Sequence, residues 1–253
     1  MYKPKLIICA GAGISAESGI PTFRNAGGEG LWENHDLNRV CSMPTFYDNY
    51  MVSNQFYIDR VAKFIGAKPN SAHQKIASLQ DDFEVICITS NIDTLFEQAG
   101  VKPENVLHVH GRLDEVVTNY GTDHQKLNKI ASSDEYLALL HDSVNYPVKP
   151  NVVFFGEHAP LYQNMYNTFA NLSNNDVIIV VGSSEQVVDF ANEARVSRYT
   201  GRIFFVNIDR DLCQRQQKCN LVIPFCGTAV SFFNQVTQDK MGHYCFPTGF
   251  GEE

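Results

Sequence analysis

The sequence predicts an α/β protein with a mostly parallel sheet, helices on both faces of the sheet, and a small second domain. The prediction rests on short apolar runs, rich in β-branched residues, that alternate with segments of helix-like periodicity. Each run is too short for an independent helix and too apolar for a sheet face open to water, as is typical of strands buried on both sides. The runs are 5–10, 84–89, 176–181 and 202–207, and the helix-like segments are 71–79, 94–99 and 189–199.

Two segments interrupt this alternation, 25–64 and 112–150. The first is rich in aromatic residues, and the second is polar, with helix-like periodicity only around 134–141. We expect the two together to form the small domain beside the sheet. A Rossmann-like domain would then comprise residues 1–24, 65–111 and 151–253, with its ligands at the carboxyl ends of the strands.

Composition and charge narrow the class of protein. The chain has 253 residues, of which 44% are hydrophobic and 19% charged, as in ordinary globular proteins. A formal net charge of -8 with scattered Lys and Arg argues against nucleic acid or anionic membrane as a partner. No segment reaches the ~18 apolar residues of a membrane span, and the first apolar run lacks the features of a signal peptide. We expect a cytoplasmic monomer.

The seven cysteines give no sign of a disulfide framework or a cysteine zinc site. Their number is odd and none belongs to a C-x-x-C pair. Cys9 and Cys87 lie inside apolar runs and are expected in the core.

The first apolar run ends in a glycine turn, Gly11 to Ala16, of the G-x-G-x-x-A type. Glycine lets such a turn approach a pyrophosphate, and the amides of the following helix point at its charge. A tight turn without any ligand is the alternative. The acidic residue ~20 positions further on that dehydrogenases use for the ribose is missing, so the turn indicates a nucleotide site of another kind.

The stretch from Gly11 to Arg24 reads GAGISAESGIPTFR and resembles the first motif of the sirtuin (Sir2) family. Five further blocks follow in the family's order, each at the end of a predicted strand or close to it. They are SNID at 90–93, VHG at 109–111, PNVVFFGE at 150–157, GSS at 182–184, and Asn207. The resemblance implies an NAD-dependent protein-lysine deacylase that yields nicotinamide, O-acyl-ADP-ribose and free lysine.

Breaking the bond between nicotinamide and ribose needs a holder for the carboxamide, a dry cleft and a base. Asn91 and Asp93 suit the polar contacts, and the resemblance places both in the nicotinamide pocket. Asp93 could instead cap the helix predicted at 94–99. The resemblance further implies that NAD is bound by Gly11, Ala12, Gly13, Ser15, Glu17, Phe23, Arg24, Ser90, Ile92, Gly182, Ser183, Ser184 and Asn207.

Two histidines, His108 and His110, are spaced so that a strand would put both on one face. Histidine suits a base near neutral pH, although a lone histidine is more often structural. The resemblance assigns the role of base to His110. His108 stays unassigned.

The segment 152–157 is predicted to be an edge that pairs with an extended peptide through its backbone, or else a plain core strand. The resemblance makes it the wall of an acyl-lysine tunnel, formed by Val153, Phe154, Phe155, Gly156 and Glu157. Tyr57 and Arg60 lie three residues apart in a helix-like stretch, where both could grip a carboxylate. This Tyr-x-x-Arg resembles the signature of sirtuins that remove succinyl, malonyl and glutaryl groups, and an ordinary surface helix is the alternative.

The sequence departs from the family in two places. Most sirtuins bind a structural zinc through two cysteine pairs in the segment after H-G, whereas 112–150 contains no cysteine. We therefore predict no zinc and a small domain held by packing. Ser90 stands where the family usually has glutamine, which removes a longer side chain near the nicotinamide ribose.

Two other functions stay open. NAD hydrolysis or ADP-ribosyl transfer would follow if a poorly formed peptide groove let another nucleophile reach the ribose. A module that binds NAD or ADP-ribose without turnover would not require the base at His110.

Overall fold

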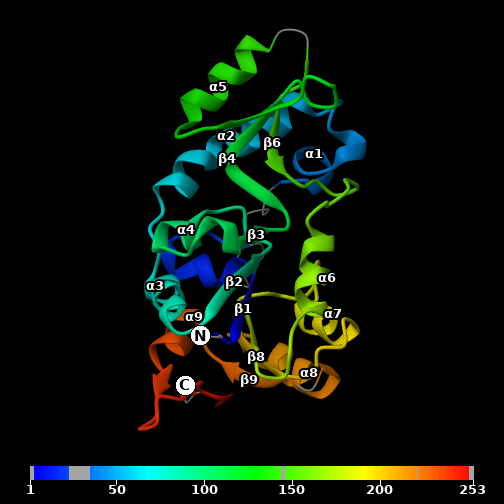
Figure 1. Ribbon diagram of the computed structural model, residues 1–253. Helices are drawn as coiled ribbons and strands as arrows, with labels where there is room; N and C mark the ends of the chain where they lie inside the picture. The colour runs from blue at the N-terminus through cyan, green and yellow to red at the C-terminus, as the bar shows by residue number, and fades with distance from the viewer. Residues whose placement is uncertain (1–2, 23–34, 144–145, 221, 251–253) are drawn as a thin grey trace.

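The main body of the protein is a parallel sheet of seven strands (Figure 1). The computed structural model describes residues 3–22, 35–143, 146–220 and 222–250. Every neighbouring pair in the sheet is parallel, which confirms the predicted α/β fold. Across the sheet the strands are β12 (Gly249–Phe250), β9 (Ile223–Cys226), β8 (Arg202–Asn207), β7 (Val177–Val181), β1 (Lys5–Ala10), β2 (Glu84–Thr89) and β3 (Val106–His108).

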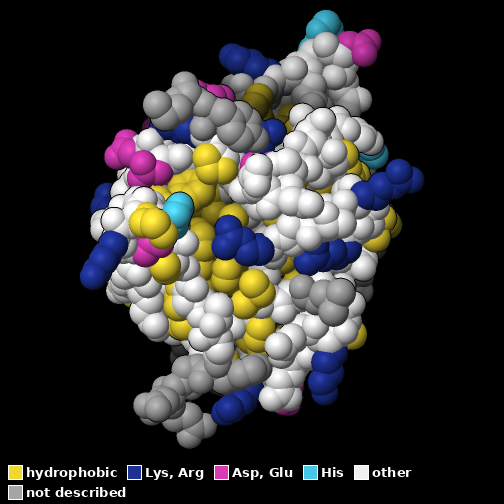
Figure 2. All heavy atoms as spheres, turned by 60° about the horizontal axis from the view of Figure 1, so that its bottom comes forward, with side chains coloured by type: hydrophobic (Ala, Val, Ile, Leu, Met, Phe, Trp, Pro, Cys, Tyr) yellow, Lys and Arg dark blue, Asp and Glu magenta, His cyan; other side chains and the backbone are white. Residues whose placement is uncertain are grey.

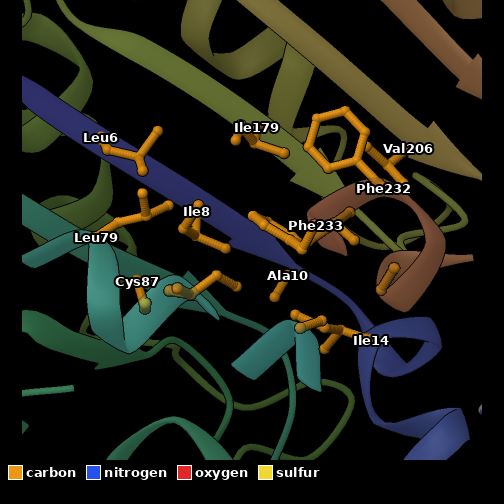
Figure 3. Packing of buried hydrophobic residues seen from close by; sticks show 14 of the residues in the cluster. Leu6, Ile8, Ala10, Ile14, Leu79, Cys87, Ile179, Val206, Phe232 and Phe233 are labelled. Atoms are coloured by element: carbon orange, nitrogen blue, oxygen red, sulfur yellow. The ribbon is translucent and has the colours of Figure 1, made fainter. Parts of the chain in front are cut away.

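Strand β1 lies inside the sheet, and its side chains alternate between the two faces. Leu6, Ile8 and Ala10 join an apolar cluster with α3 (Ser71–Ser78), α4 (Leu95–Ala99) and α9 (Ala229–Asn234), part of which is shown in Figure 3. Ile7 and Cys9 join a second cluster with α6 (Tyr162–Ala170), α7 (Phe190–Val196) and α8 (Arg210–Asn220). All five side chains are fully buried, which explains why the run is apolar without interruption.

The predicted helices form close to their expected positions because polar side chains cap them. Asn70 accepts hydrogen bonds from the amides at the start of α3, and Asp189 does so for α7. In α5 (Ser133–Asp142) the cap is Ser132. Short 3-10 helices and a hairpin complete the order: η1 (Ala12–Ser18), η2 (Met43–Thr45), η3 (Leu79–Asp81), η4 (Pro103–Asn105), β10 (Thr237–Gln238) and β11 (Tyr244–Cys245).

A smaller unit lies at one end of the molecule, at the top of Figure 1. Its antiparallel sheet has the order β5 (Lys126–Lys129), β4 (Gly111–Thr118), β6 (Lys149–Val152). Helices α1 (Leu37–Val40), α2 (Tyr50–Gly66) and α5 share its core, together with Leu95 and Phe154 from outside the two insertions. We propose that this unit is the second domain, with strands that extend beyond 112–150 at both ends.

Basic side chains are scattered over one face of the molecule (Figure 2). On the face shown in Figure 2, Lys and Arg side chains stand apart from one another among polar and apolar ones, without a continuous basic area. No helix in the described ranges is long and apolar enough to cross a bilayer.

The glycine turns after β1 and β7 pack directly against each other. The amide of Gly13 donates to the carbonyl of Gly182 at 2.9 Å, and the amide of Gly11 donates to Val181 at 3.0 Å. A Cβ on Gly11 would lie 2.7 Å from the oxygen of Gly182, so the small size of glycine serves the contact between the turns. The amides of Gly11, Gly13 and Ile14 are bonded within the chain, so these three are not free to face a pyrophosphate.

We predict that Gly182→Ala lowers the free energy of unfolding by about 2–4 kcal/mol, measured by urea denaturation. Gly182 has φ +63°, and a Cβ would lie 2.7 Å from the Cα of Gly13. Gly242→Ala is the matched control, because Gly242 has φ +82° with nothing within 4 Å of a Cβ. That control should lose about 1 kcal/mol or less. Equal losses in the two variants would show that the close approach is unimportant.

Candidate active site

A cleft of about 730 Å³ lies at the carboxyl ends of the central strands and extends into the small unit. Its size is within the range of small-molecule sites. Gly11, Ser90, Gly182 and Asn207 line it from the ends of β1, β2, β7 and β8. The aromatic side chains of Tyr57, Phe64 and Phe154 line its other part.

The structure brings most of the predicted site residues into this cleft. All the predicted cofactor residues line it except Phe23 and Arg24, which lie outside the described residues. Asn91, Asp93 and His110 line it too. So do all the predicted substrate residues except Arg60.

Ser15, Asn91 and Asp93 form a buried polar cluster at the floor of the cleft. The Ser15 hydroxyl donates to Oδ2 of Asp93 at 2.9 Å, and Nδ2 of Asn91 donates to the carbonyl of Gly11 at 3.1 Å. Oδ1 of Asp93 accepts from the amide of Leu95 at 3.1 Å, so Asp93 both lines the cleft and supports the start of α4. Burial raises the pKa of Asp93, while the Leu95 and Ser15 hydrogen bonds oppose the rise.

His110 lines the same cleft as the glycine turns and the aromatic side chains. Its Nε2 is 2.8 Å from the hydroxyl of Tyr162, and the backbone of Ser90 lies beside its ring. Burial lowers the pKa of His110, against the Ser90 hydrogen bond, which raises it. A neutral imidazole near pH 7 can accept a proton, so the geometry suits a base.

The expectation that His108 and His110 share one face is wrong. Strand β3 ends at His108, and the chain turns at Gly111, which has φ +82°. The ring of His108 is buried, with Nδ1 3.1 Å from the carbonyl of Asn91 and Nε2 2.9 Å from Oε1 of Glu97. His108 therefore supports the Asn91 loop from behind.

The edge at 152–157 is not free to pair with a peptide along its whole length. The amide of Phe155 donates to Cys41, and its carbonyl accepts from Met43 at 2.9 Å. The amide of Val153 donates to the carbonyl of His110, which fixes this wall to the predicted base. The amide of Phe154 donates to Oε2 of Glu157, so side chains and the remaining backbone groups are what this wall offers a substrate.

Tyr57 and Arg60 have different surroundings although both lie on α2. Tyr57 is fully buried, stacks on Phe154 and lines the cleft. Within the described chain its hydroxyl has no hydrogen bond of ordinary geometry, and the Cys41 thiol is the polar group beside it. The guanidinium of Arg60 lies 3.4 Å from the centroid of the Phe56 ring and donates to the Phe56 carbonyl.

Comparisons with known proteins agree with this geometry. The Sir2 family profile matches residues 11–189. A relative from Helicobacter hepaticus named NAD-dependent protein deacylase is 35% identical over 224 residues, 79% of this chain and 82% of its own length.

Two solved structures have the same fold. One, a Sir2 homolog–NAD complex, has TM-score 0.72 and 29% identity over 90% of this chain and 86% of its own. Another, a Sir2 protein with a deacetylated p53 peptide and 3'-O-acetyl ADP ribose, has TM-score 0.70 and 26% identity over 91% of each chain.

The chain belongs to the Sir2 family.

A buried ion pair ties the small unit of this Sir2 protein to the substrate wall. Nζ of Lys149 lies 2.9 Å from Oε2 of Glu157 and 4.0 Å from the centroid of the Phe154 ring. Oε1 of Glu157 accepts from the hydroxyl of Tyr120 at 2.6 Å. Burial lowers the pKa of Lys149, and the neighbouring Glu157 carboxylate opposes this change. Burial alone would raise the pKa of Glu157, but Lys149 and the hydrogen bonds from the Phe154 amide and the Tyr120 hydroxyl lower it.

The prediction of no zinc remains a prediction. In the described ranges no group of three or more His, Cys, Asp or Glu side chains is placed to hold a metal ion. The contacts of Lys149, Glu157 and Tyr120 connect the small sheet to the cleft.

Several cleft residues were missed by the sequence analysis of this Sir2 protein. Tyr162 touches His110, and Cys41 lies beside Tyr57. The segment 186–188 after the second glycine turn also lines the cleft. Only that last segment had a usable signal, because it follows directly on a predicted turn.

We predict that Tyr57→Phe changes the free energy of unfolding by less than about 0.5 kcal/mol or increases it, because the lost hydroxyl has no hydrogen-bond partner within the described part of the chain. Tyr136→Phe is the control, since Tyr136 is equally buried and donates to Oδ1 of Asn54 at 2.8 Å. It should lose about 1–3 kcal/mol, because Oδ1 of Asn54 is left without its donor. Chemical denaturation measures both, and a comparable loss in Tyr57→Phe would show that its hydroxyl is paired.

Proposed function

We propose that this Sir2-family enzyme removes acyl groups from protein lysines with consumption of NAD, and that it prefers succinyl, malonyl and glutaryl groups over acetyl. One observation carries the proposal. His110 lies in a single cleft between the strand-end turns, which suit a dinucleotide, and an apolar passage lined by Tyr57 and Phe154, which suits the stem of a lysine.

The residues present fit NAD. Gly11, Gly13 and Gly182 let the two strand-end turns meet without side chains between them, so both turns line one cleft. Ser184 is exposed in the cleft, and Asn207 is held there by donating to the carbonyl of Ser183 at 2.7 Å. NAD, when bound, supplies a nicotinamide–ribose bond. When this bond breaks, the ribose carbon that carried nicotinamide becomes the electrophile for the acyl oxygen.

In this proposal His110 is the base that takes a proton from a ribose hydroxyl. Asn91 and Asp93 contact the nicotinamide end, and their hydrogen bonds with Ser15 and Gly11 fix their orientation. The products are nicotinamide, O-acyl-ADP-ribose and free lysine.

The acyl preference rests on Tyr57. Its hydroxyl is buried beside the cleft and has no ordinary partner among the described residues, which is costly unless a ligand supplies one. A carboxylate at the end of the acyl chain would accept from it. The guanidinium of Arg60 lies over the Phe56 ring, so the Arg60 side chain would have to move away from this ring to contact the same carboxylate.

NAD hydrolysis is the second candidate, and the occupied backbone of Phe155 favours it. Both its amide and its carbonyl are bonded to Cys41 and Met43, which leaves fewer groups to hold a peptide. Water would then replace the acyl oxygen as the nucleophile.

We predict that His110→Ala lowers peptide-dependent nicotinamide release by about 10²- to 10⁴-fold, the usual contribution of a general base. Mass spectrometry with NAD and succinyl, acetyl and unmodified peptides measures it. Release that is just as fast without any acylated peptide would favour hydrolysis over deacylation.

We predict that Arg60→Met lowers kcat/KM for a succinyl peptide roughly tenfold or more relative to an acetyl peptide, the size of one charge-assisted hydrogen bond. Methionine keeps much of the apolar stem over Phe56. Lys63→Met, an exposed charge loss on the same helix, is the control and should leave the ratio unchanged. An unchanged ratio in Arg60→Met would remove the acidic preference from the proposal.

A further inference from the structure

The hydrogen bond between His110 and Tyr162 has no part in the reaction as proposed so far. Nε2 of His110 and the hydroxyl of Tyr162 are 2.8 Å apart, and their rings are tilted by 41° with centroids 5.9 Å apart. Tyr162 and His110 both line the cleft, so their contact lies at the cleft wall. The predicted base is therefore already paired.

The backbone of Ser90 decides which atom donates. A backbone carbonyl can only accept, and since Nε2 lies 2.8 Å from the Tyr162 hydroxyl, we assign the contact with Ser90 to Nδ1. Nδ1 then carries the ring proton of the neutral imidazole, and Nε2 presents a lone pair. The phenol O–H donates to that lone pair, and this donation favours the neutral ring over the imidazolium.

The position of the phenol is fixed by local structure. Tyr162 is the first residue of α6, and its amide donates to the carbonyl of Ala159. Its ring also contacts that of Tyr166, one turn further along the helix, with centroids 6.4 Å apart. The hydroxyl is thus held over the imidazole by a helix start, which a flexible loop would not achieve.

We propose that Tyr162 is a positioning residue for His110: it holds the ring as a neutral base with Nε2 facing the cleft, until a substrate hydroxyl replaces the phenol at that nitrogen. This rests on the proposed role of His110. When the substrate hydroxyl replaces the phenol, Nε2 of His110 accepts one O–H···N hydrogen bond in place of another. The nitrogen therefore remains a proton acceptor throughout.

The carboxyl groups of Asp93 and Glu157, which also line the cleft, have partners other than His110. Asp93 is bonded to Ser15 and Leu95. Glu157 is bonded to Lys149 and Tyr120. Among the described residues, the Tyr162 phenol is the ionisable group recorded in contact with the His110 ring.

The test is an NMR titration of the imidazole C–H signal of His110 in the full chain, identified by its loss in His110→Ala. In Tyr162→Phe we expect the pKa of His110 to be about 0.5 to 1 higher than in the wild type, because the donor that favours the neutral ring is gone. Tyr166→Phe, on the same helix and outside the cleft lining, should leave this pKa unchanged. Tyr162→Met removes the same donor, should raise the pKa likewise, and serves if the Phe variant folds poorly.

The pH profile of kcat/KM for NAD with an acyl-lysine peptide gives a second readout. The acid limb of Tyr162→Phe should move to higher pH by the same amount, because His110 must be neutral to act.

An unchanged pKa of His110 in both Tyr162 variants, or an equal rise in Tyr166→Phe, would overturn the proposal. The titration needs no turnover, so it separates this inference from the proposed function. A protein without peptide-dependent nicotinamide release would contradict the function and still show whether Tyr162 governs the ring.

Discussion

The contact between the two glycine turns is the constraint on which the site depends. Gly11 and Gly13 meet Gly182 at distances that leave no room for a Cβ. This contact brings the ends of β1 and β7 together, where parallel strands collect ligands. Polar side chains from β2 and β8 reach the same place, so one cleft contains the floor at Asn91 and the side chain of Asn207.

The site also depends on the contacts that attach the small unit to the main sheet. Buried charge is costly, and the ion pair of Lys149 with Glu157 is tolerable only because ring faces and backbone carbonyls surround the ammonium group. On the other side, Arg112 makes a two-pronged contact with Asp114 and also reaches Glu97, which holds His108. These contacts connect the small sheet to Glu157 in the cleft lining and to Glu97 on α4.

Much of this arrangement followed from the sequence. Strands that are buried on both faces have unbroken apolar sequences, which can be recognised without a structure. The strands β1, β2 and β8 accordingly have the predicted bounds. Blocks at strand ends share a cleft because parallel strands end at one edge, which placed Asn91 and Asn207 together.

What failed depended on side-chain direction and on contacts distant along the chain. Alternation could not place both histidines, because β3 stops at His108. Helical spacing put Tyr57 and Arg60 on one side of α2, yet burial of the first and the Phe56 ring under the second separated them. Tyr162 lies 52 residues from His110, with no pattern to connect them.

The most direct test of the central claim, that one cleft joins a dinucleotide site to an acyl-lysine site at His110, is a crystal structure with NAD and a succinyl-lysine peptide. We predict that the nicotinamide ribose lies beside Nε2 of His110 and that the succinyl group lies against the Tyr57 ring. A ribose remote from His110, or a peptide bound outside the cleft, would contradict it.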